Sequence, residues 1–135
     1  MSAQSQRSEQ MAGPLRLVLV DSITQVEPHD AGALVVSGSH GGVSAATFAA
    51  VVPALLHVFN DAGIGKERAG VRGLDLLAEV GLAGVAVGHE TARIGDARDT
   101  LENGVVTVVN EPAAALGVSI GQPLRDVVAR LSARA

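Results

Sequence analysis

Residues 54–81, ALLHVFNDAGIGKERAGVRGLDLLAEVG, contain the pattern that decides the fold class. The apolar run at residues 54–59 predicts a strand, and the polar, glycine-rich residues 60–66 predict a loop. The side chains of Val71, Leu74, Leu77 and Ala78 are then spaced so that they share one face of an α-helix. Gly81 ends this helix, because glycine readily adopts the left-handed conformation of a helix cap. A strand, a loop and a helix in this order are typical of an α/β protein.

The same alternation of strand and helix continues along the chain from residue 33 onward. It predicts an α/β fold of three layers, Rossmann-like or flavodoxin-like, in which a mostly parallel five-stranded sheet has helices on both faces. The expected strands are residues 15–20, 33–37, 54–59, 82–87 and 105–109. The expected helices are residues 43–52, the segment before Gly81, and residues 97–103, 113–116 and 123–131.

The first two expected strands are separated by a short segment, residues 21–32, which has no helical pattern. A parallel crossover needs about a dozen residues and usually includes a helix. This segment therefore favours an antiparallel first pair, with residues 15–20 at an edge of the sheet.

The N-terminal segment MSAQSQRSEQMAG is polar and has no apolar periodicity. We expect residues 1–13 to be a disordered tail whose removal leaves the melting temperature unchanged. The remaining residues 14–135 have the length of a single α/β domain.

The composition excludes several classes of function. The chain is 47% hydrophobic but only 1% aromatic, so small aliphatic side chains must form the core, as in strands buried on both faces. The absence of cysteine excludes disulfides and thiolate chemistry. The net charge is −4 and there is no basic patch, so we expect no nucleic-acid partner.

We also expect neither a membrane span nor a signal peptide. No apolar run approaches the length of a membrane span, so we expect no membrane partner. The N-terminal residues lack the apolar centre of a signal peptide, which favours a cytoplasmic protein.

Polar residues follow every expected strand of the sheet. They are Asp21-Ser22, residues 37–40, Asn60-Asp61, His89-Glu90 and Asn110-Glu111. The carboxyl ends of parallel strands lie at one edge, which is where open α/β sheets bind ligands. The sequence therefore predicts that these side chains line one cleft for a small molecule, although loops are also polar simply because they face water.

The run GSHGG at residues 38–42 precedes an expected helix. The backbone N–H groups of Gly41 and Gly42 are predicted to approach an anion there, with the hydroxyl of Ser39 beside them. His40 is a candidate proton donor or acceptor near neutral pH. The alternative is a tight strand-to-helix turn with an exposed His40.

The loop at residues 60–66 resembles a phosphate-binding P-loop only superficially. Asn60 stands at the first glycine position of that motif, and Glu67 stands where a serine or threonine is needed. What remains is Asp61 as a candidate base, with Asn60 and Lys66, the one lysine of the chain, as ligand contacts. The alternative for Lys66 is an ordinary solvated side chain.

The segment from His89 to Asp96 gathers four polar side chains within eight residues. His89 and Glu90 are candidates for proton transfer, while Arg93 and Asp96 are candidates for holding a ligand, since arginine binds a carboxylate or phosphate through two parallel hydrogen bonds. Arg93 could equally pair with a neighbouring carboxylate and fix the loop. The histidine spacings do not match a metal site, so we expect neither a metal nor another cofactor.

Three runs, GSHGG, FNDAG and ARIGD, together resemble a family of small bacterial α/β proteins of unassigned function. The similarity extends from about residue 18 to the end of the chain. It implies one α/β domain and no particular activity.

Together these features predict a small-molecule enzyme that performs acid–base chemistry on a small anionic or amide-bearing metabolite. The expected catalytic residues are His40, Asp61, His89 and Glu90. The expected ligand contacts are Ser39, Gly41, Gly42, Asn60, Lys66, Arg93 and Asp96. The alternative is a non-catalytic ligand-binding or assembly subunit, and a homo-oligomer remains open. Catalysis requires His40, Asp61 and His89 to converge, whereas an assembly subunit would scatter them and expose a broad aliphatic face.

Overall fold

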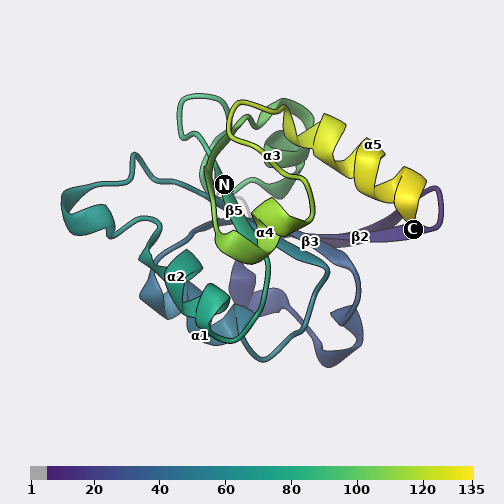
Figure 1. Cartoon of the computed structure of the whole chain (residues 1–135), viewed down its shortest axis with the longest axis horizontal. Coiled ribbons are helices and arrows are strands. Elements are labelled where there is room, and N and C mark those ends of the chain that lie inside the picture. Colours follow the sequence, from purple (N-terminus) through teal and green to yellow (C-terminus); the bar gives the residue numbers. More distant parts are fainter. Residues whose placement is uncertain (1–5) are drawn as a thin grey trace.

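The computed structural model describes residues 6–135, which form a mixed six-stranded sheet with helices on both faces (Figure 1). The strands are β1 (Arg7–Ala12), β2 (Leu15–Val20), β3 (Leu34–His40), β4 (Leu56–Asn60), β5 (Gly84–Val87) and β6 (Val106–Val109). The α-helices are α1 (Val43–Ala49), α2 (Arg72–Glu79), α3 (Ala97–Asn103), α4 (Glu111–Ala115) and α5 (Leu124–Arg134). Three short 3₁₀ turns are η1 (Ile23–Gln25), η2 (Pro28–Asp30) and η3 (Lys66–Arg68).

The strand order across the sheet is the order along the chain, β1 to β6. The four central strands are parallel, and the outer pairs β1–β2 and β5–β6 are antiparallel. The α/β class with helices on both faces is therefore confirmed, but the mostly parallel five-stranded sheet is not. The order has no reversal, so it also differs from the Rossmann and flavodoxin orders, which place ligands where the strand order reverses.

The expected antiparallel first pair is wrong. Strand β2 pairs in parallel with β3, with Leu17 opposite Leu34 and Val20 opposite Ser37. The connection between them contains only the 3₁₀ turns η1 and η2. These turns carry the chain back along the sheet without a full α-helix, which is why the missing helical pattern misled the prediction.

The N-terminal segment is not entirely a tail. Residues 7–12 form β1, which pairs antiparallel with β2 from Arg7 opposite Val20 to Ala12 opposite Leu15. Strand β1, not β2, is therefore the edge of the sheet. Most side chains of β1 are exposed, so it has no apolar alternation by which sequence analysis could find it. Residues 1–5 lie outside the described part of the chain.

Two hydrophobic cores lie on opposite faces of the sheet. In Figure 1, α1 and α2 lie below the strands, and α3 and α5 lie above them. The core on the α1–α2 face includes Val18, Val35, Ala46, Leu74 and Leu77. The core on the opposite face includes Leu17, Leu34, Val58, Leu124 and Leu131. Successive strand residues thus serve opposite cores, as the two-residue period of a strand requires.

The connection from β5 to α3, residues 88–96, crosses the carboxyl ends of three neighbouring strands; we call it the crossing segment. The side-chain amide of Asn60 donates to the carbonyl of Ala92, 3.0 Å away, which holds the segment over the end of β4. The N–H of Gly95 donates to the carbonyl of Gly38 on β3 at 2.7 Å. The chain's own backbone therefore covers part of the edge at which a ligand is expected.

No helix within residues 6–135 has both the length and the apolar character needed to cross a membrane.

Candidate functional site

Asp61 lies directly after β4 and is buried, with only 4% of the residue exposed. Its Oδ1 atom accepts the backbone N–H of Gly63 at 2.8 Å and that of His89 at 3.0 Å. Its Oδ2 atom accepts the hydroxyl of Thr107 at 2.8 Å. One carboxylate therefore joins the ends of β4 and β5 to the start of β6.

His89 follows β5 and places its ring against Asp61. Its Nδ1 atom lies 3.3 Å from Asp61 Oδ1, and 53% of the side chain is exposed. The ring also lies over Gly63, where a Cβ atom would come within 3.6 Å of it. Because a carboxylate only accepts hydrogen bonds, this arrangement favours the ring with the proton on Nδ1 and leaves Nε2 as its free acceptor.

The surroundings of Asp61 keep its carboxylate ionised. Burial by itself raises the pKa of Asp61, but the hydrogen bonds from Gly63, Thr107 and His89 favour the charged form and more than offset it. The net result is a pKa below the usual value for aspartate. Asp61 is therefore negatively charged at neutral pH.

We expect this carboxylate to make the fold sensitive to acid. The pKa of Asp61 is lower in the folded protein, so the unfolded chain takes up the proton first. The stabilisation is full at neutral pH and is lost as the pH falls below about 4 and through the lowered value. Urea unfolding measured between pH 7 and pH 3 gives the free energy of unfolding at each pH. This free energy should fall less steeply with decreasing pH for Asp61→Asn than for the unaltered protein. Asp126→Asn, on the exposed face of α5, is the control, and equal slopes in all three proteins would contradict the expectation.

Ser39 and His40 face a different depression, between η1 and α1. A shallow groove there is lined by Ser39, His40 and Phe48, among others. Ser39 Oγ accepts the backbone N–H of Ile23 at 2.9 Å, and His40 Nδ1 accepts that of Gly42 at 3.0 Å. His40 is exposed, and within residues 6–135 no hydrogen bond or ion pair joins it to Asp61 or His89.

Gly41 and Gly42 are buried, and their N–H groups are already bonded. Gly41 donates to the carbonyl of Gly70 at 2.8 Å, and Gly42 donates to His40. The carbonyl of Gly41 in turn accepts the N–H of Gly73, at the start of α2. In this structure the glycine pair joins α1 to α2 and offers no free donor to an anion.

Asn60 also has a bonding role within the fold. Its Oδ1 atom accepts the N–H of Ala62 at 2.8 Å, while its amide holds Ala92 on the crossing segment. The side chain is fully buried, so both of its polar atoms serve the ends of β4 and β5 rather than solvent.

Three further expected residues lie in exposed loops. Lys66, in η3, belongs to the part of the chain at residues 62–69 that projects at the left of Figure 1. Glu90 is exposed at the start of the crossing segment. Arg93 is exposed near the end of that segment, where Asp96 caps α3 by accepting the N–H of Asp99 at 2.9 Å.

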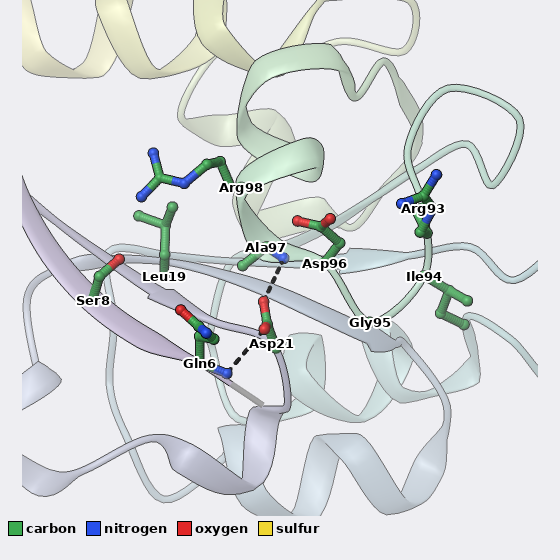
Figure 2. A pocket seen from close by; sticks show the side chains of 10 residues that line it. All are labelled: Gln6, Ser8, Leu19, Asp21, Arg93, Ile94, Gly95, Asp96, Ala97 and Arg98. Atoms are coloured by element: carbon green, nitrogen blue, oxygen red, sulfur yellow. Dashed lines mark hydrogen bonds between the residues drawn. The ribbon is translucent and has the colours of Figure 1, made fainter. Parts of the chain in front are cut away.

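Arg93 and Asp96 border a cleft of their own, shown in Figure 2. We call it the β2–α3 cleft, because it lies between Asp21 at the end of β2 and Ala97 at the start of α3. The predicted residues thus do not share one cleft. Asp61 pairs with His89, Ser39 and His40 line the groove beside α1, and Arg93 and Asp96 border the β2–α3 cleft, whereas Lys66 lies in the projecting loop. The crossing segment accounts for this separation, because it runs across the strand ends that were expected to share one cleft.

Thr107 is the site residue that sequence analysis missed. Its hydroxyl bonds Asp61 from a strand that runs opposite to β5. The sequence did contain a hint of this role, because Thr107 is the one polar residue in the apolar run VVTVV at residues 105–109. Its partner could not be inferred, because the run gave no indication that β6 is antiparallel.

Another histidine, His29, meets two carboxylates near the N-terminus. One ligand atom each from Glu9, His29 and Asp30 lies within 4.8 Å of the others, as a metal site would require. However, the Nη2 atom of Arg7 lies 2.9 Å from Glu9 Oε2 and 2.7 Å from Asp30 Oδ1. Arg16 adds a second guanidinium, with Nη1 3.2 Å from Glu9 Oε1. The two arginines supply the positive charge that a metal would otherwise bring to this cluster.

The chain was also compared with known proteins. No family model, curated protein or solved structure matches it. The resemblance to small bacterial α/β proteins therefore stays a prediction.

Proposed function

We propose that this protein is a small-molecule enzyme in which His89 transfers a proton and Asp61 orients it, acting on a small anionic or amide-bearing metabolite. The supporting observation is the contact between the buried carboxylate of Asp61 and Nδ1 of the half-exposed His89. A fixed carboxylate behind an accessible imidazole is the arrangement by which general bases are held in the correct tautomer.

Each group in the pair has a separate role in this proposal. Nε2 of His89 takes a proton from the substrate, and the positive ring that results is stabilised by the charge of Asp61. Thr107 and the N–H of Gly63 hold the carboxylate in place. His40 lies outside this group, and Glu90 makes no hydrogen bond or ion pair in the described residues.

Replacing His89 by glutamine tests the proposal. We expect turnover to fall by about 10²-fold or more, because glutamine keeps a polar side chain but cannot accept and return a proton. A substrate would first be sought by screening metabolites for a rise in melting temperature, since a ligand of the folded state stabilises it. The control is Glu90→Gln, which changes the neighbouring side chain and should keep most of the activity. A His89→Gln enzyme with nearly full turnover would remove His89 from the mechanism.

The tautomer of His89 can be measured before any substrate is known. Nitrogen-15 NMR of the neutral imidazole should show the proton on Nδ1, and Asp61→Asn should shift the ring toward the Nε2-protonated form. A ring already protonated on Nε2 in the unaltered protein would contradict the orienting role of Asp61.

A non-catalytic assembly subunit is the second candidate, and one observation favours it. Several large aliphatic and aromatic side chains are exposed on or beside α1 and α2, namely Val43, Phe48, Val51, Leu76 and Val80. Exposed apolar side chains that gather on one layer often mark a contact with another protein. Light scattering at increasing protein concentration would decide whether this layer forms an oligomer.

A further inference from the structure

Helices α1 and α2 lie side by side on one face of the sheet, below the strands in Figure 1. Exposed apolar side chains lie on these helices or directly after them, namely Val43, Phe48, Val51, Leu76 and Val80. Leu76 and Val80 follow Gly73, the residue of α2 that packs against the start of α1, at helical spacing, so both lie on the side of α2 that faces α1. We call the exposed outer side of the two helices the α1–α2 surface.

The α1 part of this surface carries no charge. No aspartate, glutamate, lysine or arginine occurs between Asp30 and Asp61, so every exposed residue of α1 is uncharged. Phe48 is one of only two aromatic residues in the chain, and it is 43% exposed. Apolar and aromatic side chains on a surface depleted of charge have the composition of the centre of a protein–protein interface.

The charges of α2 are placed against its helix dipole. Arg72 is the first residue of α2 and Glu79 is the last, whereas the start of a helix favours negative charge and its end favours positive charge. Asp75 is paired with Arg68 at 3.2 Å, but neither Arg72 nor Glu79 has a side-chain hydrogen bond or ion pair within residues 6–135. The described part of one chain therefore does not offset these two charges.

A second copy of α2, packed antiparallel, would offset both of them. A two-fold axis beside Leu76, near the middle of the helix, places Arg72 of each chain opposite Glu79 of the partner subunit. The start of each helix then gains a carboxylate and its end gains a guanidinium. Residues 72, 76 and 79 share one face of a helix because they are spaced by four and three positions, so Leu76 lies between the two charged pairs.

We propose that the α1–α2 surface is the interface of a two-fold symmetric dimer of this chain, with α2 antiparallel to α2 of the partner subunit. The apolar side chains of both helices form the centre of the interface, and the two pairs of Arg72 and Glu79 lie at its rim. A second copy of the chain is thus the partner in the assembly candidate. The proposal does not rest on proton transfer by His89, because neither Asp61 nor His89 belongs to this surface.

Sedimentation equilibrium of the full chain, from micromolar to millimolar concentration, measures the dimer, and we expect a reversible equilibrium between monomer and dimer. Leu76→Glu places two carboxylates beside the axis and should weaken the dimer by at least about tenfold. Val51→Glu should also weaken it, and because Val51 is 76% exposed this variant keeps the fold of the single chain. Ile120→Glu, in the loop before α5 and 68% exposed, is the matched control and should leave the dissociation constant unchanged.

A charge exchange tests the antiparallel arrangement. Arg72→Glu brings like charges together in both pairs and should weaken the dimer by at least about tenfold, while the single chain stays folded because a carboxylate suits the start of α2. Adding Glu79→Arg restores opposite charges across the axis. The double variant Arg72→Glu/Glu79→Arg should therefore dimerise much more tightly than Arg72→Glu alone.

His89→Gln should dimerise as tightly as the unaltered chain, which separates a failure of this proposal from a failure of the proposed enzyme. A chain that stays monomeric at every concentration, as expected if the surface contacts a different protein, overturns the proposal. Dimers that are unaffected by Leu76→Glu and Val51→Glu also overturn it, because they form through another surface. A double variant that dimerises no better than Arg72→Glu overturns the antiparallel pairing of α2.

Discussion

Replacing Arg7 by methionine is expected to lower the free energy of unfolding by about 3–5 kcal/mol, the cost of breaking a buried ion pair by removing one partner. Arg7 donates from Nη1 and Nη2 to the two oxygens of Asp30, at 2.9 and 2.7 Å. Asp30 is completely buried. Without the guanidinium, its buried charge would keep the N–H of Glu27 and only the more distant Arg16 and His29, 3.9 and 3.6 Å from Oδ1.

Urea unfolding at neutral pH measures this effect, and a double variant shows its cause. Adding Asp30→Asn to Arg7→Met removes the unpaired charge, so part of the lost stability should return. Arg125→Met, on an exposed face of α5, is the control for losing an arginine and should change stability by less than about 0.5 kcal/mol. An Arg7→Met protein as stable as the unaltered chain would show that β1 is not held by this pair.

The same contacts reverse an expectation drawn from the sequence. Deleting residues 1–13 removes β1 together with Arg7, so the melting temperature should fall instead of staying unchanged. The polar sequence of this segment concealed its role, because β1 is held by a strand ladder and by ion pairs rather than by an apolar face.

Replacing Gly73 by alanine is expected to lower the free energy of unfolding by about 2–3 kcal/mol, although alanine is the better helix former by about 1 kcal/mol. Gly73 lies in the first turn of α2 and packs against the start of α1. A Cβ atom there would lie 2.2 Å from the carbonyl oxygen of Gly42 and 2.8 Å from that of Gly41. Both contacts are with backbone, so the two helices would have to move apart.

The neighbouring residue provides the control for this substitution. Arg72→Ala places the same side chain on the exposed side of α2 with little change in helix propensity and should be close to neutral. Thermal unfolding of the two variants shows whether the loss of stability comes from the contact between α1 and α2. A Gly73→Ala protein more stable than the unaltered chain would show that α1 and α2 adjust to each other freely.

Much of the secondary structure could be predicted from local pattern. The bounds of β2 and α3 coincide with the expected residues 15–20 and 97–103. The other expected strands each correspond to an observed one within a few residues. Apolar runs and glycine or proline breaks are local signals, so one sequence is enough to place them.

Local sequence pattern could predict only part of the candidate site. That Asp61 and His89 meet follows from their positions after neighbouring parallel strands. His40 and Arg93 lie elsewhere because of the path of the crossing segment. The hydrogen bond from Asn60 to Ala92 holds this segment in place, and Gly38 has no side chain to keep it away from β3. Neither contact has a sequence signature, because each joins residues more than 30 positions apart.

The sequence by itself determined the α/β class and the placement of most elements, and it put polar side chains at the carboxyl ends of the strands. Periodicity along the chain reports which side chains are buried, and that is enough for these conclusions. The tertiary structure decided which strands run antiparallel, that residues 7–12 complete the sheet, and that the strand ends open into separate depressions. These features depend on hydrogen bonds and close backbone contacts between distant residues, and such contacts leave no period in the sequence.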